Sequence, residues 1–284
     1  MVRTASGRSN TLSGRIGACS WSLRAGTPKH LAERLAEAGL DAVQLDLSPV
    51  RKGHWSIDDT VEVLDEAGIT ICSGMMGMRG EDYSTLDSIR ETGGVRPDQH
   101  WKANLNAAQG NAEAMRGLNL DLVTLHAGFL PHDREAPEWS KMIDRLCELT
   151  ECFVEEGARV GFETGQESAE TLLAVLEEID HPDIGVNFDP ANMILYDAGD
   201  PLEALAVLAP HVFQIHVKDA VRTSQPGTWG TEVPVGKGDV DWDGFFRVLA
   251  EREIDCDLMI ERETGEDRVG DVRTARELLE RVLC

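Results

Sequence analysis

Short apolar runs alternate with longer amphipathic segments along almost the entire chain. The runs are rich in Val, Ile, Leu and Phe, and short runs of this kind are typical of strands buried on both faces of a sheet. Segments with helical spacing separate them, and two consecutive parallel strands need a crossover connection of that kind. The pattern therefore predicts an α/β fold whose parallel strands all end on one side of the sheet.

Eight strand–helix pairs follow one another without a linker-like break. Several helix starts are marked by a capping residue before proline, as in Thr27 before Pro28 and Asp200 before Pro201. Eight pairs in about 250 residues are what a closed (β/α)8 barrel requires, so we predict a single-domain TIM barrel over residues 15–284. A doubly wound open sheet is the rival, but no GxGxxG-type loop follows the first strand. The expected strands are 15–21, 41–47, 69–74, 120–126, 159–163, 185–189, 212–216 and 256–261, and the expected helices are 28–38, 56–67, 97–116, 138–156, 168–178, one from 201, 242–252 and 271–282.

Composition and charge narrow the class of protein. The chain has 284 residues, of which 42% are hydrophobic and 27% are charged, as in an ordinary globular protein. Its formal net charge of -24 argues against a nucleic-acid partner, because phosphate backbones bind basic surfaces. No apolar run approaches the roughly 18 residues of a membrane span, so no membrane partner is expected.

The N-terminal segment and the cysteines indicate a cytoplasmic protein. Residues 1–14 are rich in Ser, Arg and Gly and lack the apolar stretch of a secretory signal, so we expect a disordered tail there. The six cysteines form no CxxC pair, and several lie in apolar runs where Cys acts as a small hydrophobic residue. Reduced cysteines and a cytoplasmic location are therefore expected.

Four consecutive predicted strands end in residue types that bind metal ions, namely Glu163, Asp189, His216 and Glu261. Each one alone has an ordinary explanation, such as a turn cap for Asp189 before Pro190. In a barrel, however, all strands end at the rim that carries the active site, so these side chains should gather there. Their joint occurrence predicts a metal site. The same rim is expected to carry Trp21, Asp46, Met75 and His126.

The motifs at these strand ends resemble those of a known family. In order along the chain they are ETG, NFDPAN, IHVKD, VGKGDVDW and ERE. This combination resembles the sugar phosphate isomerase/epimerase family of xylose isomerase-like TIM barrels, which is related to the ketose 3-epimerases. The resemblance implies one divalent cation held by Glu163, Asp189, His216 and Glu261. Three carboxylates and one imidazole suit Mn²⁺, Mg²⁺ or Co²⁺, while Zn²⁺ is possible.

The resemblance also implies a reaction. A metal-dependent isomerase or epimerase moves a proton next to a carbonyl of a small sugar, keto-sugar or cyclitol, through a metal-stabilised enediolate. Proton transfer needs a carboxylate on the correct face of the substrate, and epimerisation needs one on each face. By the resemblance, Glu163 and Glu261 are both metal ligands and the acid/base pair. No Gly-rich phosphate-binding loop is evident, which favours an unphosphorylated substrate.

Further residues are expected to contact the substrate. Trp21 would form an apolar wall against a sugar ring, and Lys218 lies two residues beyond His216 on the same side of an extended strand. Arg222 stands where related ketose epimerases place a substrate-binding arginine. Asn192 replaces the histidine that many relatives carry three residues after the aspartate.

Three other functions are weighed against this one. In the first, a lyase or deglycosidase eliminates an aglycone from a 3-keto-glycoside with His126 as the base. In the second, an apurinic-site endonuclease shares the barrel, but Asn192 in place of a histidine and the net charge of -24 argue against it. The third is a non-catalytic sugar-binding relative, which the intact ligand quartet disfavours. A homodimer or homotetramer is expected for this class.

Overall fold

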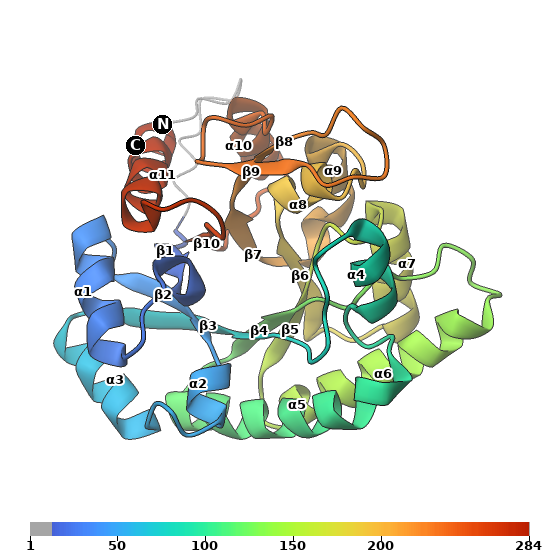
Figure 1. The fold of residues 1–284 in the computed structure, drawn as a ribbon, viewed down its shortest axis with the longest axis horizontal. Helices are drawn as coiled ribbons and strands as arrows, with labels where there is room; N and C mark the ends of the chain where they lie inside the picture. The colour runs from blue at the N-terminus through green and yellow to red at the C-terminus, as the bar shows by residue number, and fades with distance from the viewer. Residues whose placement is uncertain (1–12, 284) are drawn as a thin grey trace.

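The apolar runs form parallel strands that close into a barrel (Figure 1). The structure is a computed structural model that describes residues 13–283. Around the barrel the strand order is β1-β10-β7-β6-β5-β4-β3-β2, and each neighbouring pair is parallel. The strands are β1 Ile16–Cys19, β2 Ala42–Asp46, β3 Thr70–Met76, β4 Leu122–Leu125, β5 Arg159–Glu163, β6 Ile184–Phe188, β7 Val212–Val217 and β10 Asp257–Ile260. The predicted (β/α)8 barrel is therefore confirmed.

Helices surround the barrel on the outside, as Figure 1 shows. The larger ones are α1 Pro28–Ala38, α3 Ile57–Glu66, α5 Asp98–Leu118, α6 Pro137–Val154, α7 Ala169–Ile179, α9 Pro201–Leu208, α10 Trp242–Glu251 and α11 Arg268–Leu283. Their apolar faces pack on the outer faces of the strands and form one continuous core with them. Most strand residues are buried, which explains why the strands appear in the sequence as unbroken apolar runs.

The predicted capping residues begin the helices as expected. The Thr27 hydroxyl accepts a hydrogen bond from the His30 backbone N–H at 3.2 Å. Asp200 accepts from two backbone N–H groups in the first turn of α9, and Pro201 follows it at the first helical position. Helix α11 begins at Arg268, three residues before the predicted start.

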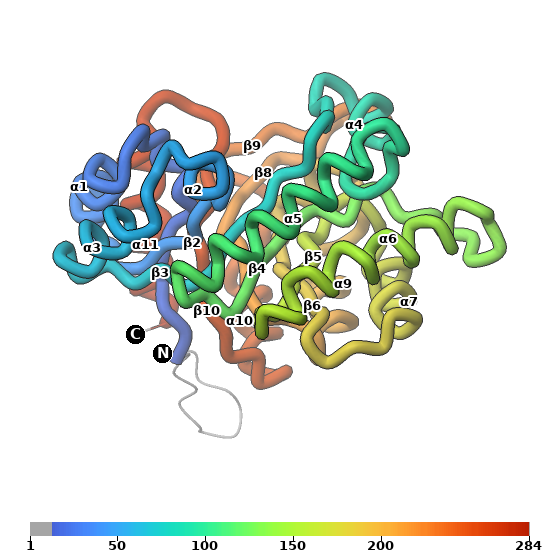
Figure 2. The backbone as a smooth tube through the Cα atoms, turned by 90° about the horizontal axis from the view of Figure 1, so that it is seen from below, coloured from blue at the N-terminus to red at the C-terminus, as the bar shows by residue number. Residues whose placement is uncertain are grey.

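Strict alternation of strands and helices is wrong at the carboxyl rim, where extra elements are inserted. An antiparallel hairpin, β8 Asp219–Val221 and β9 Thr231–Val233, follows β7 directly. Short helices also lie at or near this rim: α2 Ser48–Arg51, α4 Leu86–Thr92, α8 Pro190–Leu195 and the 3-10 turn η1 Ser20–Leu23. A second 3-10 turn, η2 Ala209–His211, lies at the opposite rim, directly before β7. Figure 2 shows α4 and the hairpin on one side of the barrel, opposite to the chain ends. These insertions cover the rim where the candidate site lies.

The predicted disordered tail lies almost entirely outside the described residues. Of residues 1–14, only Ser13 and Gly14 are described, and both backbone N–H groups donate to the Asp255 carboxylate. The five described cysteines are free, as expected. Within residues 13–283, no helix is long and apolar enough to cross a membrane.

Candidate functional site

The structure brings the four predicted metal ligands together. One ligand atom from each of Glu163, Asp189, His216 and Glu261 lies within 4.8 Å of the others, and all four residues are buried. Glu163 ends β5 and His216 lies in β7, while Asp189 and Glu261 directly follow β6 and β10. The parallel arrangement of these strands is what places the four side chains at one point.

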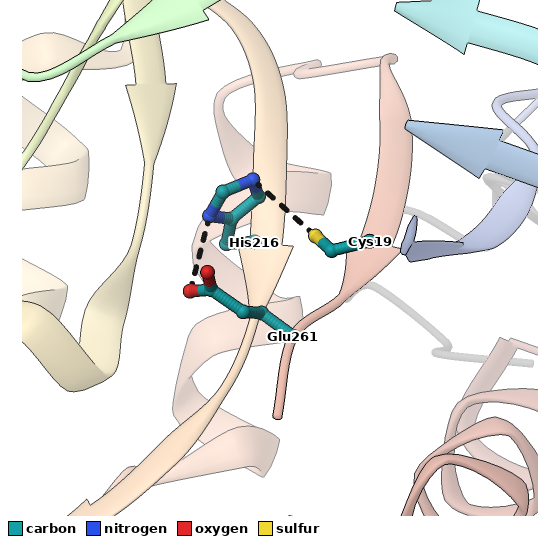
Figure 3. Close-up of side chains that lie close together, drawn as sticks. All are labelled: Cys19, His216 and Glu261. Carbon is teal, nitrogen blue, oxygen red and sulfur yellow. Dashed lines mark hydrogen bonds and ion pairs between the residues drawn. The ribbon is translucent and has the colours of Figure 1, made fainter. Parts of the chain in front are cut away.

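The imidazole of His216 is held in one tautomer by Gln44 of β2. The Gln44 amide nitrogen donates to the Thr124 hydroxyl at 2.8 Å, so its carbonyl oxygen faces His216 Nε2 at 2.6 Å. A proton on Nε2 satisfies the Gln44 oxygen, which is the shorter of its two amide contacts, since the Asn187 amide nitrogen lies 3.0 Å from Nε2. In this tautomer the lone pair is on Nδ1. Figure 3 shows the ring between Cys19 on the Nε2 side and Glu261 on the Nδ1 side. Burial raises the pKa of the Cys19 thiol to about 12, so Cys19 is a neutral neighbour.

The three carboxylates are each held by one or more hydrogen bonds. Asp189 Oδ1 accepts the backbone N–H groups of Ala191 and Asn192 and so caps α8. Glu163 Oε1 accepts from the Asn192 amide at 2.8 Å. Glu261 Oε1 accepts from the Trp21 indole N–H at 2.7 Å. Asp189 therefore has two roles. Its Oδ1 caps α8, while its Oδ2 belongs to the predicted cluster.

The remaining atoms fit a divalent cation. His216 Nδ1 and Asp189 Oδ2 are buried and have no hydrogen-bond partner among residues 13–283. Nδ1 lies 3.4 Å from both Glu163 Oε1 and Glu261 Oε2, and 3.9 Å from Asp189 Oδ2. Burial opposes a charge on His216, yet the anionic neighbours outweigh it and the net pKa is raised. A positive charge is thus favoured where three carboxylate oxygens and one imidazole nitrogen converge, and oxygen-rich donors of this kind suit Mg²⁺ or Mn²⁺.

Lys218 is a buried cation beside this cluster. Its ammonium donates to Glu261 at 3.0 Å and to Glu263 at 2.5 Å, and it lies 3.9 Å from Asp189. Burial lowers the pKa of Lys218, but the carboxylates of Glu261 and Glu263 outweigh that effect and raise it well above its ordinary value. Lys218 therefore stays protonated at neutral pH and offers a fixed positive charge to the cavity above it.

A cavity of about 590 Å³ opens onto the cluster. This volume lies within the usual range for small-molecule sites. Glu163 and Glu261 reach the cavity, as do the predicted substrate residues Trp21, Asn192 and Lys218. The further lining residues are Asp46, Ser48, Met75, Gly77, Glu81, Tyr83, His126, Leu195, Tyr196, Trp229, Gly230, Glu232, Glu263 and Thr264.

His126 and Glu81 are two titratable groups in this lining. His126 Nε2 lies 3.7 Å from Glu163 Oε1, and its Nδ1 is buried without a partner in the described part of the chain. Glu81 accepts the Gly94 backbone N–H at 3.2 Å. Burial raises the pKa of the Glu81 carboxyl. The structure thus places the predicted base His126 in the cavity together with an acid that the sequence pattern did not indicate.

Arg222 is not brought into the cavity. It follows β8, and its exposed guanidinium donates to Asp197 and to the Gly199 carbonyl oxygen. The inserted hairpin explains the difference, because a strand rather than a loop follows Lys218. The substrate-binding role of Arg222 stays a prediction without support from its position.

Sequence reasoning missed two groups of residues. The first group consists of polar side chains inside the barrel, among them Gln44. A polar residue within an apolar strand run is visible in the sequence and could have indicated this group. Asn187 and Gln214 belong to this group, since Gln214 donates to Asn187 and Asn187 donates to Glu163 Oε2 at 3.3 Å. The second group, Tyr196 and Trp229, lies on inserted elements with no pattern of their own.

Comparisons with known proteins agree with this architecture. The sequence model of the xylose isomerase-like TIM barrel family matches residues 32–282. A xylose isomerase domain protein from Planctomyces limnophilus is 28% identical, with a TM-score of 0.83 over 97% of this chain and 98% of that one. The 3-keto-D-glucoside 4-epimerase of Escherichia coli is 15% identical, with a TM-score of 0.71 over 95% and 100% of the two chains, which shows the fold alone.

Curated relatives match over shorter stretches. The chain is 26% identical to 3-oxo-isoapionate decarboxylase of Pectobacterium atrosepticum over 126 residues, which are 42% of this chain and 46% of that protein. The chain spans less than half the length of the curated relatives that it matches. Their activities therefore do not transfer to it directly.

Proposed function

Because the chain belongs to the xylose isomerase-like TIM barrel family, we propose that it is a divalent-metal-dependent isomerase or epimerase of a small sugar, keto-sugar or cyclitol. The observation that carries this proposal is the position of Glu163 and Glu261. Both lie 3.4 Å from His216 Nδ1, and both line the cavity. A substrate held there has a carboxylate close to its reacting carbon, which proton transfer requires.

The chain's residues prepare both carboxylates for this role. Burial alone would raise the pKa of Glu163, but His126 and His216 outweigh it and the net pKa is lowered. Burial acts on Glu261 in the same way, while Lys218 and His216 lower its pKa well below the ordinary value. Both are thus ionised at neutral pH, which is the protonation state that a proton acceptor requires.

The metal would be held by the quartet Glu163, Asp189, His216 and Glu261. When bound, a divalent cation of the Mn²⁺, Mg²⁺ or Co²⁺ type, with Zn²⁺ as a further possibility, supplies Lewis-acid stabilisation of an enediolate's negative charge. Trp21 and Lys218 position Glu261, and Asn192 positions Glu163, through the hydrogen bonds described above. Lys218 also offers its charge to a substrate oxygen.

A second candidate activity rests on His126. The place of His126 in the cavity lining, with its Nε2 3.7 Å from Glu163 Oε1, favours a base that acts on a different substrate carbon from the carboxylates. Such a base would serve the elimination of an aglycone from a 3-keto-glycoside. A non-catalytic sugar-binding role remains the alternative outcome of the test that follows.

Solvent deuterium exchange tests the proposal. Protein with Mn²⁺ or Mg²⁺ is incubated in D₂O with ketoses, aldoses, inososes, 3-keto-glycosides and, given the decarboxylase match, 3-keto acids, and NMR reports the labelled carbon. Metal-dependent incorporation that Glu163→Gln and Glu261→Gln abolish supports proton transfer, while the surface variant Glu177→Gln serves as the control. Aglycone release that depends on His126 supports elimination. Sugar binding without exchange on any substrate would contradict the isomerase assignment and favour a binding protein.

The setting of the protein is proposed on the same basis. The free cysteines suit a reducing, cytoplasmic compartment. The net charge of -24 disfavours nucleic acid as a partner, and a small-molecule sugar remains the expected one. A homodimer or homotetramer is proposed, which light scattering would measure directly.

A further inference from the structure

One wall of the cavity is aromatic and comes from the elements inserted at the rim. Leu195 and Tyr196 end helix α8, and Trp229 and Gly230 lie just before β9. The Tyr196 and Trp229 rings meet edge to face, with centroids 4.8 Å apart, and Phe129 packs on Tyr196 at 5.7 Å in the same way. We call Leu195, Tyr196, Trp229 and Gly230 the aromatic wall.

The aromatic wall is anchored to the barrel at both ends. The Gly230 backbone N–H donates to the Leu195 carbonyl oxygen at 3.1 Å, which joins the hairpin to α8. Two residues further on, Glu232 pairs with Arg262 at 2.7 Å, and both side chains are buried. Gln166 donates to the Tyr196 hydroxyl at 3.4 Å. The wall is therefore a fixed surface of the cavity rather than a loose loop.

Trp229 contributes its ring, and not its N–H, to the cavity. The residue lines the cavity, while its indole nitrogen is buried out of a ligand's reach and has no partner among residues 13–283. The Trp229 ring is therefore available to pack on an apolar face of a ligand, and sugar rings present such faces.

The cavity is larger than a single sugar requires. A hexose has roughly twelve heavy atoms and needs at most about 360 Å³, taking about 30 Å³ per heavy atom as for liquid water. The cavity measures about 590 Å³ and also runs along the aromatic wall. The wall itself carries no charged side chain, and Glu232 beside it is paired with Arg262. The additional space thus suits a neutral ring.

We propose that the aromatic wall is a subsite for a second, non-reacting ring, so that the substrate is a glycoside rather than a free monosaccharide. This inference rests on the proposed function, which places the reacting sugar next to Glu163 and Glu261. The second ring packs on Trp229 and Tyr196, whose rings form the apolar part of this wall. Trp229 is then a residue that determines specificity.

Calorimetric titration of the Mn²⁺-loaded protein tests the subsite without turnover. The probes are matched pairs with one and two rings: glucose with cellobiose, galactose with lactose, and glucose with phenyl β-D-glucoside. We expect the two-ring ligand of at least one pair to bind at least about tenfold more tightly, which corresponds to one aromatic packing contact of about 1.4 kcal/mol. Trp229→Ala should remove most of this advantage, and Trp229→Phe, which keeps a smaller ring, should remove part of it.

Trp101→Phe is the matched control, because Trp101 lies on α5 under Arg145 and does not line the cavity. Trp101→Phe should leave the ratio of two-ring to one-ring affinity unchanged. Equal binding within every pair, or an unchanged ratio in both Trp229 variants, would overturn the subsite. The two proposals fail separately. Deuterium exchange on monosaccharides, with no tighter binding of two-ring ligands, would contradict only the subsite. Tighter binding of two-ring ligands, with no deuterium exchange on any substrate, would contradict only the isomerase assignment.

Discussion

The tautomer of His216 is decided by a residue that does not face the cavity. Gln44 is itself fixed by Thr124, so its carbonyl oxygen is available to His216 Nε2. A ligand imidazole whose other nitrogen donates to a fixed acceptor is oriented and made more basic. Gln44 is therefore a positioning residue for the candidate metal centre.

Gln44→Leu should weaken Mn²⁺ binding about 10- to 100-fold, the usual cost of losing such a partner. The cause is the loss of the acceptor that keeps the proton on Nε2. Calorimetric titration with Mn²⁺ measures the change, and Gln44→Glu, which keeps an acceptor, is the control. Equal Mn²⁺ affinity in Gln44→Leu and the wild type would show that Gln44 only fills space.

Glu81 should make stability depend on pH in a defined direction. Burial raises its pKa in the folded protein above the ordinary value of 4.5. The stability associated with neutral Glu81 is thus fully present below pH 4.5 and is lost as the pH rises through the folded pKa. Glu81→Gln stays neutral and can still accept the Gly94 N–H.

Glu81→Gln should therefore raise Tm at pH 8 by roughly 2–4 °C, which corresponds to about 1 kcal/mol in a protein of this size. At pH 4 it should change Tm little, because the wild-type carboxyl is then neutral in both states. Thermal unfolding at the two pH values measures the difference. A Tm gain of equal size at both values would exclude an ionisation effect.

At the scale of elements, Asp219 organises the hairpin and the segment after it. Its two carboxylate oxygens accept backbone N–H groups of Ala220, Gly236, Gly238 and Val240, and the indole N–H of Trp242. A Cβ on Gly238 would lie 2.1 Å from Asp219 Oδ1, so only glycine allows this approach. The VGKGDVDW motif thus has a structural role, because its backbone N–H groups and the Trp242 indole bind Asp219.

Asp219→Ala should destabilise the protein by about 2–4 kcal/mol, because several buried N–H groups lose a charged acceptor at once. Urea unfolding measures the loss, and hydrogen exchange should show it first in residues 234–241. Asp200→Ala, which removes two hydrogen bonds from an exposed helix cap, should cost only about 1 kcal/mol. Equal costs in the two variants would contradict the organising role of Asp219.

The repeating strand–helix pairs of the barrel could be predicted from the sequence, but the inserted strands β8 and β9 could not. Barrel strands appear in the sequence as unbroken apolar runs, and capped helices such as α1 and α9 carry local start signals. Strands β8 and β9 have three residues each, and their pairing depends on Asp219 and on contacts with α8. Such short strands have little periodicity, so tertiary contacts decide them.

At the scale of the whole molecule, barrel closure explains why the clustering of the four candidate metal ligands could be predicted. Four residues far apart in sequence meet because their parallel strands all end at one rim. The residues that line the cavity beyond the strand ends cannot be predicted in this way. Trp229 and Tyr196 reach it from inserted segments, while Arg222, expected there, pairs with Asp197 instead.

The central claim is that the quartet binds one divalent cation, and metal stoichiometry tests it most directly. Asp189→Asn keeps the cap on α8 because Asn is an equally good capping residue. It replaces Oδ2, which accepts no hydrogen bond among residues 13–283, with an amide nitrogen. Asp200→Asn makes the same change at the exposed cap of α9, outside the quartet, and is the matched control. After dialysis against Mn²⁺, elemental analysis should find about one ion per chain in the wild type and in Asp200→Asn, and far less in Asp189→Asn, as expected for a single site. Equal metal content in all three proteins, or none in the wild type, would contradict the account.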